Sequence, residues 1–267
     1  MTNKQKAVTA IVAVGIIAAL GGGYSYLKPA SHVVIATWNV RGYPEKQAAD
    51  RQWFTATVNA LHPDVMCVQE IANQSKVDTF LKTETRFISA AFQDSDDGQD
   101  NAIFATTRVT MQDMPDPDGF QHPAQIAYIA YKGFDAVLVT VHLSWTDTAR
   151  REEEKVLLQN IVTQSLRKDP DVIICGDFNT TEQDIEDLAQ ALGMVVMVPA
   201  GQDGMGTTWA GNRYDHFLIS PDLASEEAVA CQIWACPPAD QETAEQVSDH
   251  RPVLAVFSAA AKYRDRN

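Results

Sequence analysis

The residues Ser248-Asp249-His250-Arg251-Pro252 run directly into the apolar segment 253–257, Val-Leu-Ala-Val-Phe. A carboxylate and an imidazole side by side at the start of a buried strand supply nothing that a hydrophobic core requires. Taken alone, the Asp-His pair is explained by a charged surface turn. It gains importance from the rest of the chain, where other apolar runs end beside polar residues that can bind metal or move protons.

Apolar runs rich in Val and Ile recur along the chain, and each predicts a strand buried on both faces. A polar residue stands at or next to the end of each run: Asn39 after 33–38, Glu70 after 65–69, His142 after 137–141, and Asp177, with Asn179 close by, after 172–176. A turn or a helix cap explains any one of them. The whole set predicts a site, because ligands of layered α/β folds bind beyond strand ends, where loops converge.

The order of the expected elements indicates the fold. Many strands and few helices in mixed order predict an α/β protein, a four-layered α/β sandwich with two packed mixed β-sheets flanked by helices. Strands are expected near 33–39, 64–69, 86–91, 101–107, 125–131, 135–142, 171–176, 194–197, 214–219, 228–235 and 252–257, and helices near 46–61, 73–82, 147–167 and from 181 onward. The charges on the first turns of helix 147–167 are interpreted as a solvated face. The polar segments 93–99 and 112–122 are expected to be substrate-contacting loops.

The chain has 267 residues, enough for one large domain, which is expected to span residues 31–260. Residues 1–30 differ, because the stretch 7–27 has no charge and would span about 31 Å as a helix, close to a bilayer core. This segment predicts an N-terminal membrane anchor, with a cleaved signal peptide as the alternative. In both cases Lys4 and Lys6 hold the tail inside and the rest is exported, either anchored facing the periplasm or extracellular side or secreted.

The chain is strongly acidic, with a formal net charge of -14 that becomes -17 when residues 1–30 and their lysines are left out. An acidic surface repels phosphate backbones and argues against tight non-specific binding of DNA. It does not exclude a nuclease, since a bound divalent cation or a local basic rim can reverse the field at one place.

The four cysteines show no zinc-binding pattern. Cys67 and Cys175 lie inside expected strands and are interpreted as core residues. Cys231 and Cys236 have two interpretations: a local disulfide in an oxidising compartment, or free thiols that strand geometry holds apart.

The polar residues at the strand ends include the residue types that bind divalent metal ions. Glu70 supplies a hard oxygen ligand, and Asn39, Asp177, Asn179 and Asp249 add further oxygens. With no cysteine among them, the set favours Mg²⁺ or Mn²⁺ over zinc.

Two histidines, His142 and His250, are then available for proton transfer. Asp100 and Asp215 stand at strand starts, where either carboxylate could fix the tautomer of a histidine. The remaining histidines are interpreted as packed or surface residues: His32, His62, His122 and His216.

Together the motifs resemble one known family. The matching segments are Ala36-Thr-Trp-Asn-Val-Arg-Gly42, Val68-Gln-Glu70, Val141-His-Leu143, Gly176-Asp-Phe-Asn179, Tyr214-Asp215 and Ser248-Asp-His250. Their order and spacing over about 31–258 are similar to those of the endonuclease/exonuclease/phosphatase superfamily. That superfamily includes deoxyribonuclease I, exonuclease III, neutral sphingomyelinases and inositol-polyphosphate 5-phosphatases.

The resemblance implies a metal and a water-activating group. Glu70 would be the principal ligand of Mg²⁺, with Mn²⁺ or Ca²⁺ as alternatives, and Asn39 would lie beside it. Asp249 would support the metal or the water. Asp177 would orient or deprotonate the attacking water, and Asn179 would hold a non-bridging phosphate oxygen.

The resemblance also implies roles for two histidines. His250, paired with Asp215, would contact the scissile phosphate. In the branch similar to deoxyribonuclease I, a second histidine acts from the opposite side. His142 matches that histidine, with Asp100 as its expected carboxylate partner.

One departure from the family pattern concerns a phosphate-contacting cation. Members similar to deoxyribonuclease I have an arginine just before the strand that leads into the strand of the first histidine. Here residues 120–124 read Phe-Gln-His-Pro-Ala, without arginine. Arg41, Arg213 and Arg251 lie beside the motifs and are candidates to replace it, ordinary ion pairing being the alternative.

The expected function is that of a Mg²⁺-dependent phosphodiester hydrolase, a deoxyribonuclease I-like endonuclease that acts by in-line attack of water on phosphorus. The alternative is a phosphatase or phosphodiesterase acting on a lipid or small phosphoester. A non-catalytic binding module is the third reading. The expected partners are nucleic acid, or alternatively phospholipid, and a membrane through the N-terminal segment, and the chain is expected to be a monomer.

Overall fold

The computed structural model describes residues 31–43, 48–95, 98–199, 202, 204–236 and 241–260. The expected N-terminal anchor or signal peptide at 1–30 lies outside the described residues. Within those ranges, no helix is both long enough and apolar enough to cross a bilayer.

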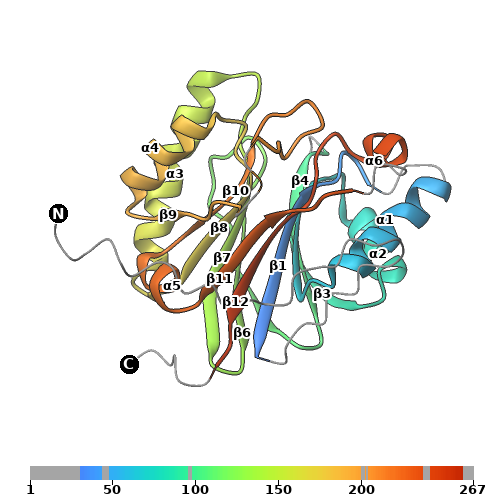
Figure 1. Cartoon of the computed structure of the whole chain (residues 1–267). Helices are drawn as coiled ribbons and strands as arrows, with labels where there is room; N and C mark the ends of the chain where they lie inside the picture. Colours follow the sequence, from blue (N-terminus) through green and yellow to red (C-terminus); the bar gives the residue numbers. More distant parts are fainter. Residues whose placement is uncertain are drawn as a thin grey trace.

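Two six-stranded mixed sheets form the centre of the fold (Figure 1). The first has the strand order β11-β12-β1-β2-β4-β3, and the second has the order β5-β6-β7-β8-β10-β9. The strands of the first sheet are β1 His32–Asn39, β2 Val65–Ile71, β3 Phe87–Phe92, β4 Asp100–Thr106, β11 Ala228–Ile233 and β12 Val253–Ser258. Those of the second are β5 Thr110–Met114, β6 Gln125–Tyr131, β7 Phe134–His142, β8 Val172–Asp177, β9 Val195–Val196 and β10 Asp215–Ile219.

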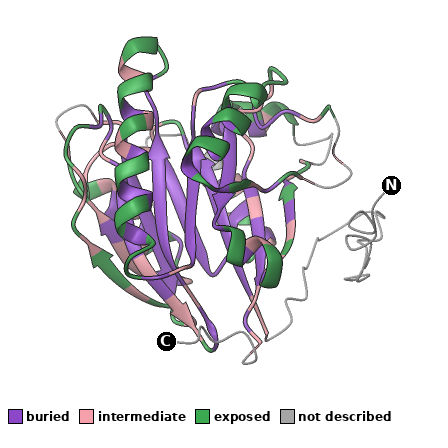
Figure 2. Cartoon of the chain, turned by 90° about the vertical axis from the view of Figure 1, so that its left-hand side faces the viewer, coloured by how far each residue is buried: buried purple, intermediate pink, exposed green. Residues whose placement is uncertain are grey.

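Helices cover the outer faces of both sheets, which gives the expected four layers. Helices α1 (Ala48–Leu61), α2 (Gln74–Thr83) and α6 (Gln241–Val247) lie beside the first sheet. Helices α3 (Thr148–Ser165) and α4 (Glu182–Leu192) lie on the second, and α5 (Pro221–Glu226) connects β10 to β11. In Figure 2 the sheets are buried while the outward faces of the helices are exposed. The predicted α/β sandwich is confirmed.

The alternation of side chains along the central strands explains the layering. In β8, Ile173 and Cys175 face the first sheet, while Val172 and Ile174 pack in the cluster that includes helices α3 and α4. Every residue of β8 is buried, as expected for a strand covered on both faces.

Several expectations need correction. The segment 112–122, expected to be a loop, begins inside β5, an edge strand with mostly exposed polar side chains and no apolar alternation to signal it. The short helices α5 and α6 were not predicted from the sequence. Cys231 is buried in β11, and within the part of the chain that the structure describes no disulfide joins it to Cys236.

Candidate active site

Three neighbouring strands of the second sheet place three site residues level with one another. His142 of β7 is the register partner of Asp177 in the parallel strand β8, and Asp177 is the partner of Asp215 in β10. Gly176 makes this close pairing possible. Its φ is +137°, and a Cβ atom at this position would lie 2.0 Å from the carbonyl oxygen of Val141.

The first sheet contributes Asn39 and Glu70 from the parallel strands β1 and β2. Asn39 pairs with Gln69, so Glu70 lies one residue further along. Glu70 has φ +60°, and the register between β2 and β4 shifts between Val68 and Ile71. A left-handed glutamate is strained and is found where the surroundings require a particular side-chain direction. Here the bulge presents the Glu70 carboxylate, 27% exposed, to the neighbouring site residues.

His250 arrives on the loop before β12, and hydrogen bonds to the first sheet fix that loop. The Ser248 hydroxyl donates to the Asn39 carbonyl oxygen at 2.7 Å and accepts from the His250 amide at 3.0 Å. The Trp38 indole donates to the His250 carbonyl oxygen at 3.0 Å. The Ser248-Asp249-His250 motif is therefore bonded to the motif around Asn39.

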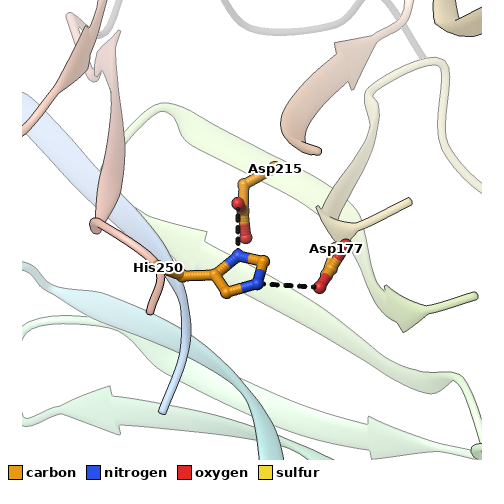
Figure 3. Close-up of side chains that lie close together, drawn as sticks. All are labelled: Asp177, Asp215 and His250. Carbon is orange, nitrogen blue, oxygen red and sulfur yellow. Dashed lines mark hydrogen bonds and ion pairs between the residues drawn. The ribbon is translucent and has the colours of Figure 1, made fainter. Parts of the chain in front are cut away.

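The imidazole of His250 lies between two aspartates (Figure 3). Its Nδ1 is 2.8 Å from Asp215 Oδ2, and its Nε2 is 3.5 Å from Asp177 Oδ2. Burial lowers the pKa of His250, but the charge and hydrogen bond of Asp215, followed by the charges of Asp177 and Asp249, outweigh it and raise that pKa to about 10. The Asp215 carboxylate thus holds His250 as an imidazolium with Nε2–H directed toward Asp177.

A single amide joins the carboxylates of the two sheets. Asn39 Nδ2 donates to Glu70 Oε1 at 2.9 Å and to Asp177 Oδ2 at 3.2 Å. His142 Nε2 lies 3.9 and 3.8 Å from the same two oxygens. The Oδ1 atom of Asn39 accepts from the Arg41 amide at 3.0 Å, whereas its Nδ2 atom faces the carboxylates.

Asn179 is bonded to the other carboxylate oxygen of Asp177, the one that Asn39 does not contact. Its φ is +47°, a conformation that asparagine tolerates better than most residues. Its amide donates to Asp177 Oδ1 at 2.9 Å, and its side-chain nitrogen donates to the Leu143 carbonyl oxygen at 2.9 Å.

His142 does not have the carboxylate partner that was expected. The Asp100 Oδ1 atom accepts from the amide and the hydroxyl of Ser95, and no hydrogen bond joins Asp100 to His142 in the described structure. Instead the His142 ring stacks on His122, with centroids 4.7 Å apart and planes 19° apart. The buried Nδ1 of His142 has no hydrogen-bond partner among the described residues.

The arginines proposed as replacements for the missing cation differ in availability. Arg213 and Arg251 donate to backbone carbonyl oxygens, and Arg251 also stacks over Trp209 at 4.1 Å. Arg41 is 55% exposed, with its Nε 3.8 Å from Oδ1 of the 59% exposed Asp249. The Asp249 carboxylate therefore faces Arg41 at the rim, and in the described part of the chain no hydrogen bond or ion pair joins it to Glu70 or Asp177.

The comparisons with known proteins agree with this geometry. The model of the Endonuclease/Exonuclease/phosphatase family matches residues 36–250. The chain belongs to this family. This match confirms the resemblance that the sequence motifs indicated. Members of the family are phosphoesterases. A comparison with curated proteins gives no match.

Several solved structures share the fold of this chain. The D. rerio TDP2 complexed with a single strand DNA product has a TM-score of 0.66 at 21% identity, over 85% of this chain and 99% of that one. The mannosyl-6-phosphatase of Bacteroides thetaiotaomicron gives 0.63 at 17%, over 84% and 98%. The human Nocturnin catalytic domain with a bound sulfate anion gives 0.63 at 16%, over 85% and 94%. At these identities the likeness shows the fold alone.

The site of this family member fits a divalent cation near Glu70. Asn39 Nδ2 donates to both Glu70 Oε1 and Asp177 Oδ2, and His142 Nε2 lies 3.9 and 3.8 Å from the same two oxygens. Such hard oxygen donors suit Mg²⁺, Mn²⁺ or Ca²⁺. The ligand atoms of Asp177, Asp215 and His250 also lie within 4.8 Å of one another. In that group, however, Asp215 and His250 are already bonded to each other, so it is better described as a proton-holding pair beside Asp177.

Sequence reasoning missed two residues that organise the site. Gln69 donates to Thr140 Oγ1 at 2.8 Å and so links the two sheets beneath the carboxylates. Glu154, expected on a solvated helix face, is fully buried and accepts from the amides of Gln121 and Ser144, both at 2.8 Å. No signal in the run 152–154 distinguishes Glu154 from its exposed neighbours. Gln69 precedes Glu70 in a strand, which was a usable signal.

Proposed function

We propose that the chain is a divalent-metal-dependent phosphodiester hydrolase, an endonuclease similar to deoxyribonuclease I. The observation that supports this best is the convergence of His250 and His142 on Asp177. The Nε2 atoms of the two histidines lie 3.5 and 3.8 Å from Asp177 Oδ2. A carboxylate flanked by two imidazoles can accept a proton from water while an imidazole gives one to the leaving oxygen.

In this proposal each residue of the chain has one task. Asp177 orients the attacking water and takes its proton. His250, held as an imidazolium by Asp215, donates Nε2–H to the phosphate. Asn179, fixed by Asp177 and Leu143, faces a non-bridging oxygen, and His142 acts from the other side.

The proposed metal is Mg²⁺, with Mn²⁺ or Ca²⁺ as alternatives. Glu70 would hold it, and Asn39 would order the Glu70 and Asp177 carboxylates around it. When bound, it would stabilise the negative charge that develops on the phosphate oxygens. Asp249 is assigned to the rim with Arg41 rather than to the metal.

Charge favours a diester over a monoester as the substrate. A phosphate monoester has about 1.5 to 2 negative charges near neutral pH, whereas a diester has only one. Among the described arginines beside the motifs, Arg41 is the one whose guanidinium is exposed rather than bonded to the backbone, and the chain has a net charge of -14. A weakly basic site tolerates the single charge of a diester better. The single strand DNA product in D. rerio TDP2 is consistent with a nucleic-acid substrate.

Nicking of supercoiled plasmid by the full chain tests the proposal. With Mg²⁺ we expect conversion to open circles, none with chelator, and a loss of at least 100-fold in H250Q. The exposed residue Glu153 provides a matched control, since E153Q should nick like the wild type. No cleavage of either supercoiled plasmid or circular single-stranded DNA by the wild type, or equal cleavage by H250Q, would refute the endonuclease.

The second candidate is a phosphatase or phosphodiesterase of a lipid or small phosphoester. The acidic net charge disfavours a long polyanion such as nucleic acid, and the fold is similar to that of a mannosyl-6-phosphatase. Release of phosphate or phosphocholine from vesicles or sugar phosphates, without plasmid nicking, would support it. Export of the chain, its anchoring through residues 1–30 and its monomeric state belong to the same proposal and stay predictions.

A further inference from the structure

One tryptophan is exposed at the edge of the site. Trp145 is 64% exposed, whereas Trp38, in the hydrophobic core, is 1% exposed. A single exposed apolar side chain is ordinary on a protein surface. Trp145 differs from an ordinary exposed side chain in two ways. Its loop begins beside the proposed catalytic residues, and hydrogen bonds fix the backbone of that loop.

The loop that presents Trp145 begins at the proposed catalytic residues. It leaves β7 directly after His142, and three residues span at most about 11 Å. Leu143, between them, donates its amide to the Asp177 carbonyl oxygen at 2.9 Å and accepts from the Asn179 side chain at 2.9 Å. The Cα atom of Trp145 therefore lies within about 11 Å of the Cα atom of His142, a proposed catalytic residue.

Buried and charged partners fix the backbone of this loop. The Ser144 amide donates to the buried Glu154 carboxylate at 2.8 Å. Arg151 Nη1 donates to the carbonyl oxygens of Ser144 and Trp145 at 2.7 and 3.5 Å. Asp147 then caps helix α3 by accepting from the Arg150 amide. The indole thus projects from a preorganised backbone, which lowers the entropic cost of binding a flat partner.

We infer that Trp145 is a stacking platform for an unpaired nucleobase next to the scissile phosphate, which makes single-stranded nucleic acid the preferred substrate class. This inference rests on the proposed function. A chain with a net charge of -14 gains little affinity from phosphate contacts, so stacking on an aromatic ring is the available source of affinity. Insertion into a lipid surface is less suitable, because the loop neighbours of Trp145 are Ser144, Thr146 and Asp147, which are polar or acidic.

Binding and cleavage of single-stranded oligonucleotides by the full chain test the inference. W145A should raise KM ten- to a hundredfold with kcat nearly unchanged, and W145F, which keeps a ring, should stay within about fivefold of the wild type. V156A, at an exposed apolar position on α3, is the matched control. In oligonucleotides with one abasic nucleotide, a single position should reproduce the loss, and W145A should add nothing further there.

Binding measured in the H250Q background separates this inference from the proposed function. If W145A weakens the Kd of H250Q for the oligonucleotide at least tenfold, the stacking platform is supported even where turnover is absent. An equal Kd with and without Trp145 would overturn it. So would a W145A variant that loses binding to phosphatidylcholine vesicles while it binds the oligonucleotide normally, since that result assigns the ring to a membrane.

Discussion

His250 Nδ1 lies 2.8 Å from Asp215 Oδ2, and this bond joins a loop of the first sheet to a strand of the second. Asn39 crosses the same boundary to Asp177, and Gln69 crosses it beneath them to Thr140. The site therefore exists only when the two sheets are packed together. Its geometry depends on the register of the sandwich as much as on the individual side chains.

The first prediction concerns the Asp215–His250 pair. In D215N the amide cannot hold His250 as an imidazolium, so we expect kcat to fall about 10²–10³-fold, with a smaller change in KM. Steady-state hydrolysis of bis(4-nitrophenyl) phosphate with Mg²⁺ measures this. The double variant D215N/H250Q should be no slower than H250Q alone, because the two residues act as a unit. A double variant that is another hundredfold slower would contradict the pairing.

The second prediction concerns Gly176, which lies in β8 opposite Val141 of β7 and lets the two strands approach closely beside the site. In G176A the new Cβ would lie 2.0 Å from the Val141 carbonyl oxygen, in a backbone conformation that alanine avoids. We expect a loss of more than about 3 kcal/mol in the free energy of unfolding, measured by urea denaturation. G193A is the matched control. Gly193 also has a positive φ but open space around it, and should cost about 1–2 kcal/mol.

The sequence was sufficient to predict the layers and most of the site, for a physical reason. Apolar runs in the sequence predict buried strands. Residues at the ends of such runs meet in space when the strands are adjacent. Asn39, Glu70, Asp177 and His250 were placed in this way, and their contacts agree with it. The exposed edge strand β5 had no such apolar signal and was missed.

Pairings between side chains from different loops were harder to predict. Asp100 was expected to bond to His142, but it bonds to Ser95, five residues away along the chain. His122, interpreted as a packed or surface histidine, is buried, and its packing partner, the ring of His142, was not predicted. Such contacts depend on loop paths and side-chain directions, which neither periodicity nor motif spacing specifies.

The third prediction concerns Glu154, whose two oxygens accept from Gln121 and Ser144 on two loops at the site. In E154Q one oxygen is replaced by an NH₂ group that faces an amide donor. We expect a loss of about 1–3 kcal/mol of stability and a several-fold loss of kcat/KM as the loops loosen. E153Q, on the exposed face of the same helix, should change stability by less than about 0.5 kcal/mol. Wild-type stability in E154Q would show that the loops do not depend on this carboxylate.

The fourth prediction concerns the pH dependence of stability at Asp116. Burial raises the pKa of this carboxyl from 3.8 to about 6, although the Ile126 amide and the Gln125 side chain donate to it. Because the folded pKa exceeds the unfolded value, the stabilisation from protonated Asp116 is complete below pH 3.8. It is lost as the pH rises through 6.

D116N should therefore be more stable than the wild type at pH 8, since asparagine keeps an acceptor for the Ile126 amide without a charge. The gain should be about 1 kcal/mol, because Asp116 is only half-buried and solvent screens its charge. That corresponds to a Tm about 2–4 °C higher at pH 8 and equal Tm values at pH 3.5. D118N, at an exposed aspartate of the same loop, serves as the control. If the two Tm values were equal at pH 8, or if the gain of D116N persisted at pH 3.5, burial of the Asp116 charge would not be the cause.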